Sequence, residues 1–367
     1  MRIALLTYST KPRGGVVHTL ALAEALAELG HDVTVCTLGR GGDHAFFREV
    51  DPRVALQVVP FPAGPEGETV GQRILRSIAV LRAGLALGGF DVVHAQDCIS
   101  ANAVDGALRT VHHLDAFSTP ELIACHDRAL REPRALVCVS AAVAGEVQEH
   151  YGRDAAVIPN GVDAARFAGA AGPAGAAERE AWRGRFGRFV LAVGGIEPRK
   201  GTLDLLAAFV LLRRRHPDLR LVLAGGETLF DYRDYRADFD ALAEREGILV
   251  DELGVVDDPA LPGLVAAAAA FSFVSTKEGF GLAALEALAA RVPVVARDLP
   301  VLREVFGGTV RFAADVPGIA AALEVVLDDP PDPEAGAALA SRYAWSTAAT
   351  AHVAMYERVL RGEVPGA

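Results

Sequence analysis

The sequence predicts an α/β protein made of two Rossmann-like, doubly wound domains that face each other across a cleft. The length of 367 residues suits two domains of ~100 to 200 residues each. In both halves, short apolar runs typical of buried strands alternate with longer helical patterns, which is the order expected for parallel sheets. The hydrophobic content of 51% is enough to fill two cores.

The composition argues against several classes of protein. A net charge of -11 disfavours general nucleic-acid binding, which needs a cationic surface. The four cysteines are scattered without CxxC spacing, which indicates reduced thiols. The first residues lack the apolar core of a signal peptide, and no apolar run approaches the ~20 residues of a membrane span. We therefore expect a cytoplasmic protein.

The first βαβ unit is the clearest pattern of the N-terminal half. Residues 2–8 resemble a buried strand, leucines recurring up to Gly30 indicate a helix, and residues 32–37 form the next strand. Gly14 and Gly15 precede this helix, where absent side chains let a ligand approach the backbone, although such glycines are as often plain turn residues. The loop lacks the GxGxxG pattern of dinucleotide sites, so an oxidoreductase loses its main support.

Residues 70–87 form a predicted amphipathic helix that carries Arg73, Arg76 and Arg82. A solvated basic face explains these arginines. Contact with anionic lipid is the alternative and would be at most peripheral, because stable interfacial binding usually needs a larger basic cluster.

The next two strands, 91–94 and 109–112, each end in a polar residue. Ligands of open α/β sheets collect at the carboxyl ends of strands. This rule brings five residues into consideration, although a lone histidine is more often structural than catalytic: His94, Asp97, His112, His113 and Asp115. Residues 135–139 and 155–158 complete the first sheet.

Turn-forming and Ala/Gly-rich segments predict the domain boundaries. The turn at 159–163 is followed by an Ala/Gly-rich stretch at 168–177 that suits a linker. We expect an N-terminal domain at 1–170, a linker at 171–187, a C-terminal domain at 188–345 and a last helix within 346–367 that is long enough to return to the first domain.

The second βα series carries two adjacent cations at its first crossover. Arg199 and Lys200 follow the strand 189–193 and precede a helix at 203–215. They could be merely solvated, or they could neutralise a diphosphate. Five further strands are expected at 219–224, 249–253, 270–274, 292–296 and 309–312.

The segment 271–288, FSFVSTKEGFGLAALEAL, passes from an apolar strand through a glycine-bearing loop into strong helix formers. A helix that begins near Gly281 presents the unpaired amides of Gly281, Leu282 and Ala283 as an anion site. Glu278 and Glu286 would lie on either side of that anion and accept hydrogen bonds from sugar hydroxyls. The alternative is an ordinary strand-turn-helix unit with both glutamates solvated.

Four motifs in this order resemble one known family along nearly the whole chain. They are the GG and LAxALAELGHDVTV-type unit at 14–35, PNGVD at 159–163, EPRKG at 197–201 and EGFGLAALEALA at 278–289. The chain resembles the retaining glycosyltransferases of the GT-B fold, from the large group-one family that is numbered four in the sequence-based classification.

The resemblance implies roles for particular residues. Glu286 would accept the ribose hydroxyls, and Glu278 would contact the transferred sugar. Arg199 and Lys200 would bind the diphosphate, together with the amides of Leu282 and Ala283 and the Gly14/Gly15 loop. His112 would be the histidine near the reacting sugar, with His113 as the competing alignment.

Two departures from the family pattern stand out. Gly195 replaces an arginine that many relatives carry, so Arg199 must supply the guanidinium. The stretch Ala-Arg-Val at 290–292 replaces a more usual turn of a small residue and a glycine.

The implied activity is retaining transfer of a hexosyl unit from a nucleoside diphosphate sugar, with no metal and no other cofactor. The acceptor, which is unidentified, could be a small molecule, a glycan or a lipid-linked molecule. A nucleotide-sugar epimerase of the same architecture and a non-catalytic nucleotide-binding module are the alternatives. Neither the donor base and sugar nor the oligomeric state follows from the sequence.

Overall fold

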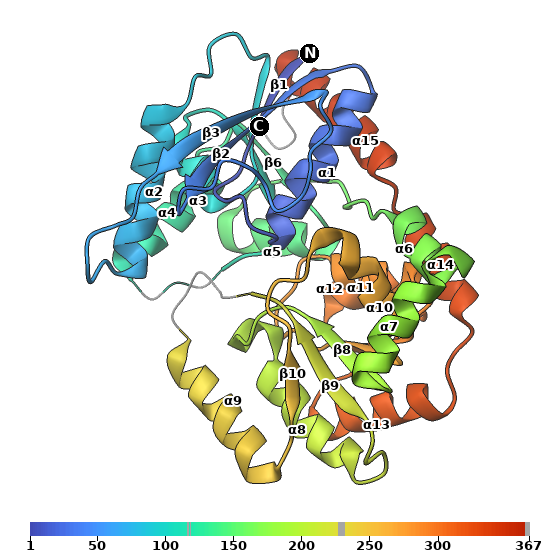
Figure 1. The fold of residues 1–367 in the computed structure, drawn as a ribbon. Coiled ribbons are helices and arrows are strands. Elements are labelled where there is room, and N and C mark those ends of the chain that lie inside the picture. The colour runs from blue at the N-terminus through green and yellow to red at the C-terminus, as the bar shows by residue number, and fades with distance from the viewer. Residues whose placement is uncertain (116, 118, 227–231, 364–367) are drawn as a thin grey trace. The chain divides into compact units, whose positions relative to one another are not determined.

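The computed structural model describes residues 1–115, 117, 119–226 and 232–363. The chain divides into two compact units (Figure 1). Unit 1 comprises Met1–Gly161 and the chain from Trp345 onward, and unit 2 comprises Val162–Ala344.

Unit 1 is built on a parallel sheet of seven strands in the order β3-β2-β1-β4-β5-β6-β7. The chain changes direction across the sheet between β1 and β4, and ligands of such sheets bind at the carboxyl ends of the strands near this point. The strands are β1 (Arg2–Leu6), β2 (Asp32–Arg40), β3 (Val54–Phe61), β4 (Val92–Ala95), β5 (Leu108–Val111), β6 (Ala135–Cys138) and β7 (Ala156–Val157).

Three helices of unit 1, α2, α3 and α5, begin after a residue whose side chain caps the helix. For α2, Thr69 and Gln72 form a reciprocal capping box, in which each side chain accepts from the other residue's backbone N–H. Asp97 caps α3 by accepting from the Ser100 amide. The helices are α1 (Gly14–Glu28), α2 (Val70–Gly84), α3 (Cys98–Ala103), α4 (Pro120–Arg131), α5 (Ala141–Tyr151) and α15 (Trp345–Leu360).

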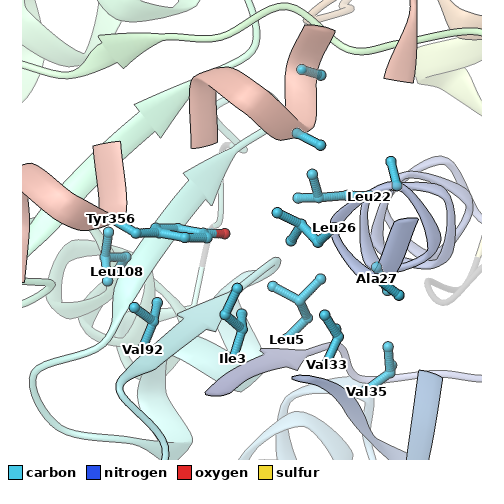
Figure 2. Close-up of a cluster of buried hydrophobic side chains, with 14 of the residues drawn as sticks. Ile3, Leu5, Leu22, Leu26, Ala27, Val33, Val35, Val92, Leu108 and Tyr356 are labelled. Atoms are coloured by element: carbon cyan, nitrogen blue, oxygen red, sulfur yellow. The ribbon is translucent and has the colours of Figure 1, made fainter. Parts of the chain in front are cut away.

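The C-terminal helix α15 supplies part of the core of unit 1. Figure 2 shows Tyr356 of α15 beside Leu108 and near the strand residues that face Leu22 and Leu26 of α1. Tyr356 is fully buried, and its hydroxyl hydrogen-bonds to Nδ1 of His94 at 2.8 Å. Because burial of one large apolar side chain stabilises by about 1.5 to 3 kcal/mol, α15 is an integral element of this unit.

Unit 2 contains a parallel sheet of six strands in the order β10-β9-β8-β11-β12-β13. The change of direction lies between β8 and β11, so the turns that follow these two strands meet at one edge. The strands are β8 (Phe189–Val193), β9 (Arg220–Ala224), β10 (Val250–Glu252), β11 (Ala270–Phe273), β12 (Val294–Arg297) and β13 (Arg311–Ala313).

Helices accompany this sheet along the whole of unit 2, and short 3-10 turns introduce three of them. The helices are α6 (Ala164–Ala171), α7 (Ala176–Phe186), α8 (Thr202–Arg213), α9 (Arg233–Glu246), α10 (Leu261–Ala267), α11 (Leu282–Ala289), α12 (Pro300–Phe306), α13 (Val316–Asp328) and α14 (Pro333–Ser341). The turns are η1 (Pro173–Gly175), η2 (Pro198–Lys200) and η3 (Asp258–Ala260).

The predicted fold class is confirmed for each unit, since both contain a doubly wound, all-parallel sheet. Among the described residues, no helix combines the length and apolar character needed to cross a bilayer.

The boundaries differ from those predicted. The chain leaves unit 1 after Gly161 and returns at Trp345, and the expected linker at 171–187 is mostly helical and belongs to unit 2. Its alanines favour helix, and Phe186 at its end is buried, which a free linker would not achieve. Residues 364–367 of the predicted last segment lie outside the described residues.

Two local predictions were also wrong. The edge strand β3 was missed, because its exposed and buried residues do not alternate regularly and Pro60 lies within it. Gly14 and Gly15 do not precede the first helix but are its first two residues.

Candidate active site

The turn between β8 and α8 in unit 2 brings backbone and cation together. Gly194 has φ 149°, and a Cβ there would lie 3.1 Å from the Lys200 side chain. Gly201 has φ 64°, and its Cβ would meet the carbonyl oxygen of Val274 at 2.4 Å. Both φ values disfavour a residue with a Cβ, and at Gly201 the backbone carbonyl leaves no room for one. The two glycines therefore fix Arg199 and Lys200 against the end of β11.

Glu278 is held by both cations. Lys200 Nζ donates to Glu278 Oε1 at 2.7 Å, and Arg199 Nη1 donates to the same oxygen at 3.2 Å. Arg199 also pairs with Glu197 at 3.2 Å. The side chain of Glu278 is only 11% exposed, whereas Arg199 keeps 31% of its side chain accessible. Two cations and one shielded carboxylate therefore share one edge of unit 2.

The pKa of Glu278 reflects this arrangement. Burial by itself raises the pKa, but the charges of Lys200 and Arg199 and the hydrogen bonds from Lys200 and Ser275 outweigh it and lower the pKa to about 2. Glu278 is thus a carboxylate at neutral pH. It can accept hydrogen bonds from a ligand's hydroxyls but cannot act as an acid.

Helix α11 begins at Leu282, directly after this loop, with Gly281 as its N-cap. Gly281 has φ 109°, and a Cβ there would lie 2.8 Å from the ring of Phe306. No side chain caps this terminus. The backbone amides of Leu282 and Ala283 lie before the first amide that donates a hydrogen bond within the helix. They therefore point out of its N-terminus, where the helix dipole is positive.

Glu286 lies in the second turn of α11 and is partly buried. Burial raises its pKa to about 8; Arg166 opposes that rise, and Asp258 and Asp163 add to it. Its carboxyl group makes no hydrogen bond or ion pair with any described residue, whereas Arg166 is paired with Asp258 at 2.9 Å. Glu286 is therefore a carboxyl group whose charged form lacks a partner.

In unit 1 the structure places His112 over the start of α1. A Cβ on Gly15 would lie 3.6 Å from the His112 ring, while Gly14 faces open space. Burial, reinforced by His113 and Arg109, lowers the pKa of His112 to about 3, so the ring is neutral at pH 7. His113 is instead paired with Asp115 at 3.1 Å.

A set of buried rings extends from His112 to α15. His18 stacks edge-on against His112, with ring centroids 4.8 Å apart, and its Nδ1 hydrogen-bonds to Asn160 at 2.9 Å. His94, which was considered as a site residue, bonds Tyr356 and Thr110 and so has a structural role. His352 of α15 completes the set, with Nδ1 bonded to the Ala348 carbonyl at 2.8 Å.

The structure brings the predicted residues together in two groups. Unit 2 assembles Glu278, Arg199 and Lys200 beside the start of α11, and unit 1 assembles Gly15 with His112. The sequence did not point to Arg166 and Asp258 as neighbours of Glu286, because they lie about 120 and 28 positions away on elements that no motif marked. The possible lipid-binding face on α2 is largely neutralised, since Arg76 pairs with Glu68 and Arg82 with Asp105.

Comparison with known proteins matches both halves of the chain to family models. Residues 12–166 match the model described as "Glycosyltransferase Family 4", and residues 183–341 match "Glycosyl transferases group 1". The second model spans the whole sheet of unit 2, whereas the first begins after β1 and includes the remaining strands of the sheet of unit 1.

Relatives match over almost the full length. A protein of Mycobacterium tuberculosis named glycogen synthase is 32% identical, with 99% of this chain and 96% of the relative covered. A phosphatidyl-myo-inositol mannosyltransferase of Mycolicibacterium smegmatis is 31% identical, with 98% and 94% covered. The solved structure of HepE from Anabaena, a complex with UDP and glucose, aligns with a TM-score of 0.73 at 19% identity and covers 97% of this chain and 99% of its own. The chain therefore belongs to the group 1 glycosyltransferases of family four, and it has the GT-B fold of this family.

Proposed function

We propose that the chain transfers a hexosyl unit from a nucleoside diphosphate sugar to an acceptor, with retention of the anomeric configuration. The observation that carries this proposal is the convergence of Lys200 and Arg199 on Glu278 beside the unpaired amides of α11. Relatives named for glucan synthesis and mannosyl transfer, and a structural neighbour solved with UDP and glucose, support a hexosyl donor.

The leaving group is a nucleoside diphosphate, which carries the charge that develops as the glycosidic bond breaks. Lys200, Arg199 and the amides of Leu282 and Ala283 would stabilise that charge, so that the protein needs no nucleophile of its own. The bond between the anomeric carbon and the diphosphate oxygen breaks. The acceptor oxygen bonds to that carbon from the same face, and its proton passes to the departing diphosphate.

The two glutamates would hold the groups on either side of the diphosphate. Glu278, a carboxylate fixed by Lys200, would accept hydroxyls of the transferred sugar. Glu286, whose carboxyl group has no described partner, would accept the ribose hydroxyls. His112 beside Gly15 would contact the reacting sugar as a neutral ring.

We infer that neither a metal nor a cofactor other than the donor is needed, because side-chain cations and helix amides supply the positive charge. Activity should survive EDTA unchanged, and a loss that added Mg²⁺ or Mn²⁺ restores would overturn this inference.

Product analysis tests the proposal directly. Purified protein is first screened by thermal shift against UDP-, GDP- and ADP-sugars, since a ligand at 100 times its Kd stabilises by about 2.7 kcal/mol. The stabilising donor is then incubated with candidate acceptors, and NMR reads the anomeric configuration of the product. Retention supports the proposal, whereas inversion contradicts it. An isomerised nucleotide sugar formed without acceptor would identify an epimerase instead, and the absence of any turnover would leave a nucleotide-binding module.

A further inference from the structure

The motif PNGVD at 159–163 has no part in the proposed donor site, yet its asparagine makes a buried hydrogen bond. Asn160 is only 4% exposed, and its Oδ1 is bonded to Nδ1 of His18 at 2.9 Å. His18 lies in the second turn of α1 and is also buried. The bond joins residues that are 142 positions apart, so it is a feature of the tertiary structure and not of a local turn.

Gly161 fixes the position of Asn160 by close packing against the start of α15. A Cβ on Gly161 would lie 2.4 Å from the backbone nitrogen of Trp345 and 2.5 Å from Cγ of its ring. Such distances leave no room for a side chain at this position. The ring of Trp345 also packs edge-on against His18, with centroids 5.3 Å apart. The first residue of α15 therefore holds both partners of the hydrogen bond in place.

The bond to Asn160 determines which nitrogen of His18 carries the proton. The amide oxygen of asparagine can only accept, so Nδ1 of His18 donates and is the protonated nitrogen. Its Nε2 has no partner among the described residues. Burial lowers the pKa of His18 well below its ordinary value, and the neighbouring histidines lower it further, so the ring is neutral at pH 7.

His18 in turn lies against His112, the histidine of the proposed site. The two ring centroids are 4.8 Å apart and the ring planes are inclined by 79°, so the edge of one ring meets the face of the other. A hydrogen bond to the backbone of Gln96 favours protonation of His112, which means that the ring donates to the carbonyl. Because Nε2 of His112 has no partner among the described residues, Nδ1 is the donor. Nε2 is thus left as an acceptor beside Gly15, whose Cβ would lie 3.6 Å from it.

We propose that Asn160 and His18 are positioning residues for His112. Asn160 fixes the plane and the tautomer of the His18 ring, and His18 fixes the plane of the His112 ring. Nε2 of His112 is thereby held in one direction as a hydrogen-bond acceptor. The inference rests on the proposed function, in which His112 contacts the reacting sugar, and it adds two residues that act through His112 and not on the sugar itself.

Nuclear magnetic resonance of the full chain tests this coupling without any need for turnover. In protein labelled with 15N-histidine, ring correlations identify the protonated nitrogen of each ring, and the signals lost in His18→Gln and His112→Gln assign the two rings. We expect both rings to be neutral and protonated on Nδ1 at pH 7. Asn160→Ala should shift the ring signals of His112 as well as those of His18. A His18 ring protonated on Nε2, or His112 signals that Asn160→Ala leaves unchanged, would overturn the proposal.

Asn160→Asp distinguishes positioning from simple packing. Aspartate has nearly the same shape and also accepts from Nδ1 of His18, but its charge favours the protonated ring. His18 should therefore gain a titration between about pH 5 and 8 that the wild type lacks, and the Nε2 signal of His112 should follow the same titration. A titration of His18 that His112 does not follow would show that the two rings are independent and would overturn the proposal.

Kinetics of the same variants locate the effect in the reaction. The donor is held by unit 2 in the proposed function, so Asn160→Ala and His18→Gln should lower kcat about tenfold or more and change the donor KM less than about twofold. Thr69→Ala is the control, because it removes the capping box of α2 at an exposed turn and weakens unit 1 elsewhere. It should keep the wild-type kcat. An equal loss of kcat in Thr69→Ala and Asn160→Ala would reduce the effect to stability and overturn the proposal.

A transfer assay separates this inference from the proposed function. Coupled ring signals of His18 and His112, without hexosyl transfer from any donor, would support the positioning of the ring and refute the transferase. Transfer with a wild-type kcat in Asn160→Ala and His18→Gln would support the transferase and refute the inference.

Discussion

The substitution Glu286→Gln should stabilise unit 2 while it weakens donor binding. Glu286 is partly buried, its pKa is raised to about 8, and no described group pairs with its charged form. Glutamine has nearly the same shape but no charge. At pH 7 the carboxyl group of Glu286 is ionised in the unfolded chain but mostly protonated in the folded unit. Glutamine carries no charge in either state, so the variant avoids the free-energy cost of this difference.

The magnitude follows from linkage between protonation and folding. The folded pKa is raised above the ordinary value of 4.5, so the folded state binds more protons and its stability falls as pH rises from 4.5 towards 8. Each pH unit in this window costs about 1.36 kcal/mol, which amounts to about 3 kcal/mol at pH 7 and less than about 1 kcal/mol at pH 5. Because Glu286 is partly accessible to water, these values are upper limits.

Fluorescence can report on unit 2 alone. The chain has two tryptophans, Trp182 in unit 2 and Trp345 in unit 1, so a Trp345→Phe background leaves Trp182 as the only reporter. Urea unfolding in this background should show Glu286→Gln to be more stable than its parent at pH 7, by a margin that shrinks at pH 5. The exposed Glu334→Gln serves as the control and should show no such dependence. Equal stability at pH 7, or a gain that persists undiminished at pH 5, would refute the reasoning.

The same substitution should remove a pH dependence of donor binding. If the ribose hydroxyls donate to ionised Glu286, binding releases a proton below pH 8, and affinity at pH 7 is about tenfold weaker than at pH 9. Calorimetry in two buffers of different ionisation enthalpy measures the released proton. A wild-type Kd that is flat from pH 6 to 9 contradicts this role of Glu286.

Three further predictions concern other parts of the chain. Lys200→Ala should lower kcat/KM for the donor by roughly 10- to 100-fold, because a charged hydrogen bond to the leaving group is lost, and this corresponds to about 1 to 3 kcal/mol of transition-state stabilisation. A wild-type kcat/KM in steady-state kinetics would exclude Lys200 from the site. Arg291→Gly should raise the free energy of unfolding of unit 2 by up to about 1 kcal/mol, because glycine relieves the backbone strain of Arg291 at φ 62° and only an exposed ion pair with Glu334 is lost. A variant that is less stable in the Trp182 fluorescence assay would show that this strain is negligible. Acid should destabilise unit 1 as pH falls from 6.5 towards 4, because burial lowers the pKa of His352 to about 4, and this residue alone accounts for about 2 kcal/mol of lost stability at pH 5. His352→Gln should therefore flatten the pH profile of urea unfolding followed through the fluorescence of Trp345. An unaltered profile would assign the acid effect to another residue.

Local patterns predicted much of the fold. Most strands, and helix α11 after Gly281, follow from apolar runs, glycines and helix formers that lie within a few residues of one another. The edge strand β3 could not be predicted in this way, because Val54–Phe61 forms a strand only through its pairing with β2. The residues of one segment do not reveal which other strand it pairs with. Helix α7 was mistaken for part of a linker because the prediction extended from the Ala/Gly-rich stretch at 168–177, and alanine is common in both linkers and helices.

The candidate site was predictable only where one motif contains the residues. Glu278 and Glu286 belong to one segment, and the cations at 199–200 were placed near them by sheet topology. The surroundings of Glu286 were not predictable, since Arg166 and Asp258 reach it from separate elements and together with burial set its pKa.

The return of α15 to unit 1 has a consequence for biosynthesis. Residues 1–161 emerge from the ribosome first, yet Tyr356, Ala349 and Met355, which fill part of their core, are among the last to be made. Unit 2 is a single uninterrupted stretch and can fold as soon as Ala344 has been released. The half that is begun first is thus finished last, and a nascent chain cut short before its final helix would have one completed half and one with an open core.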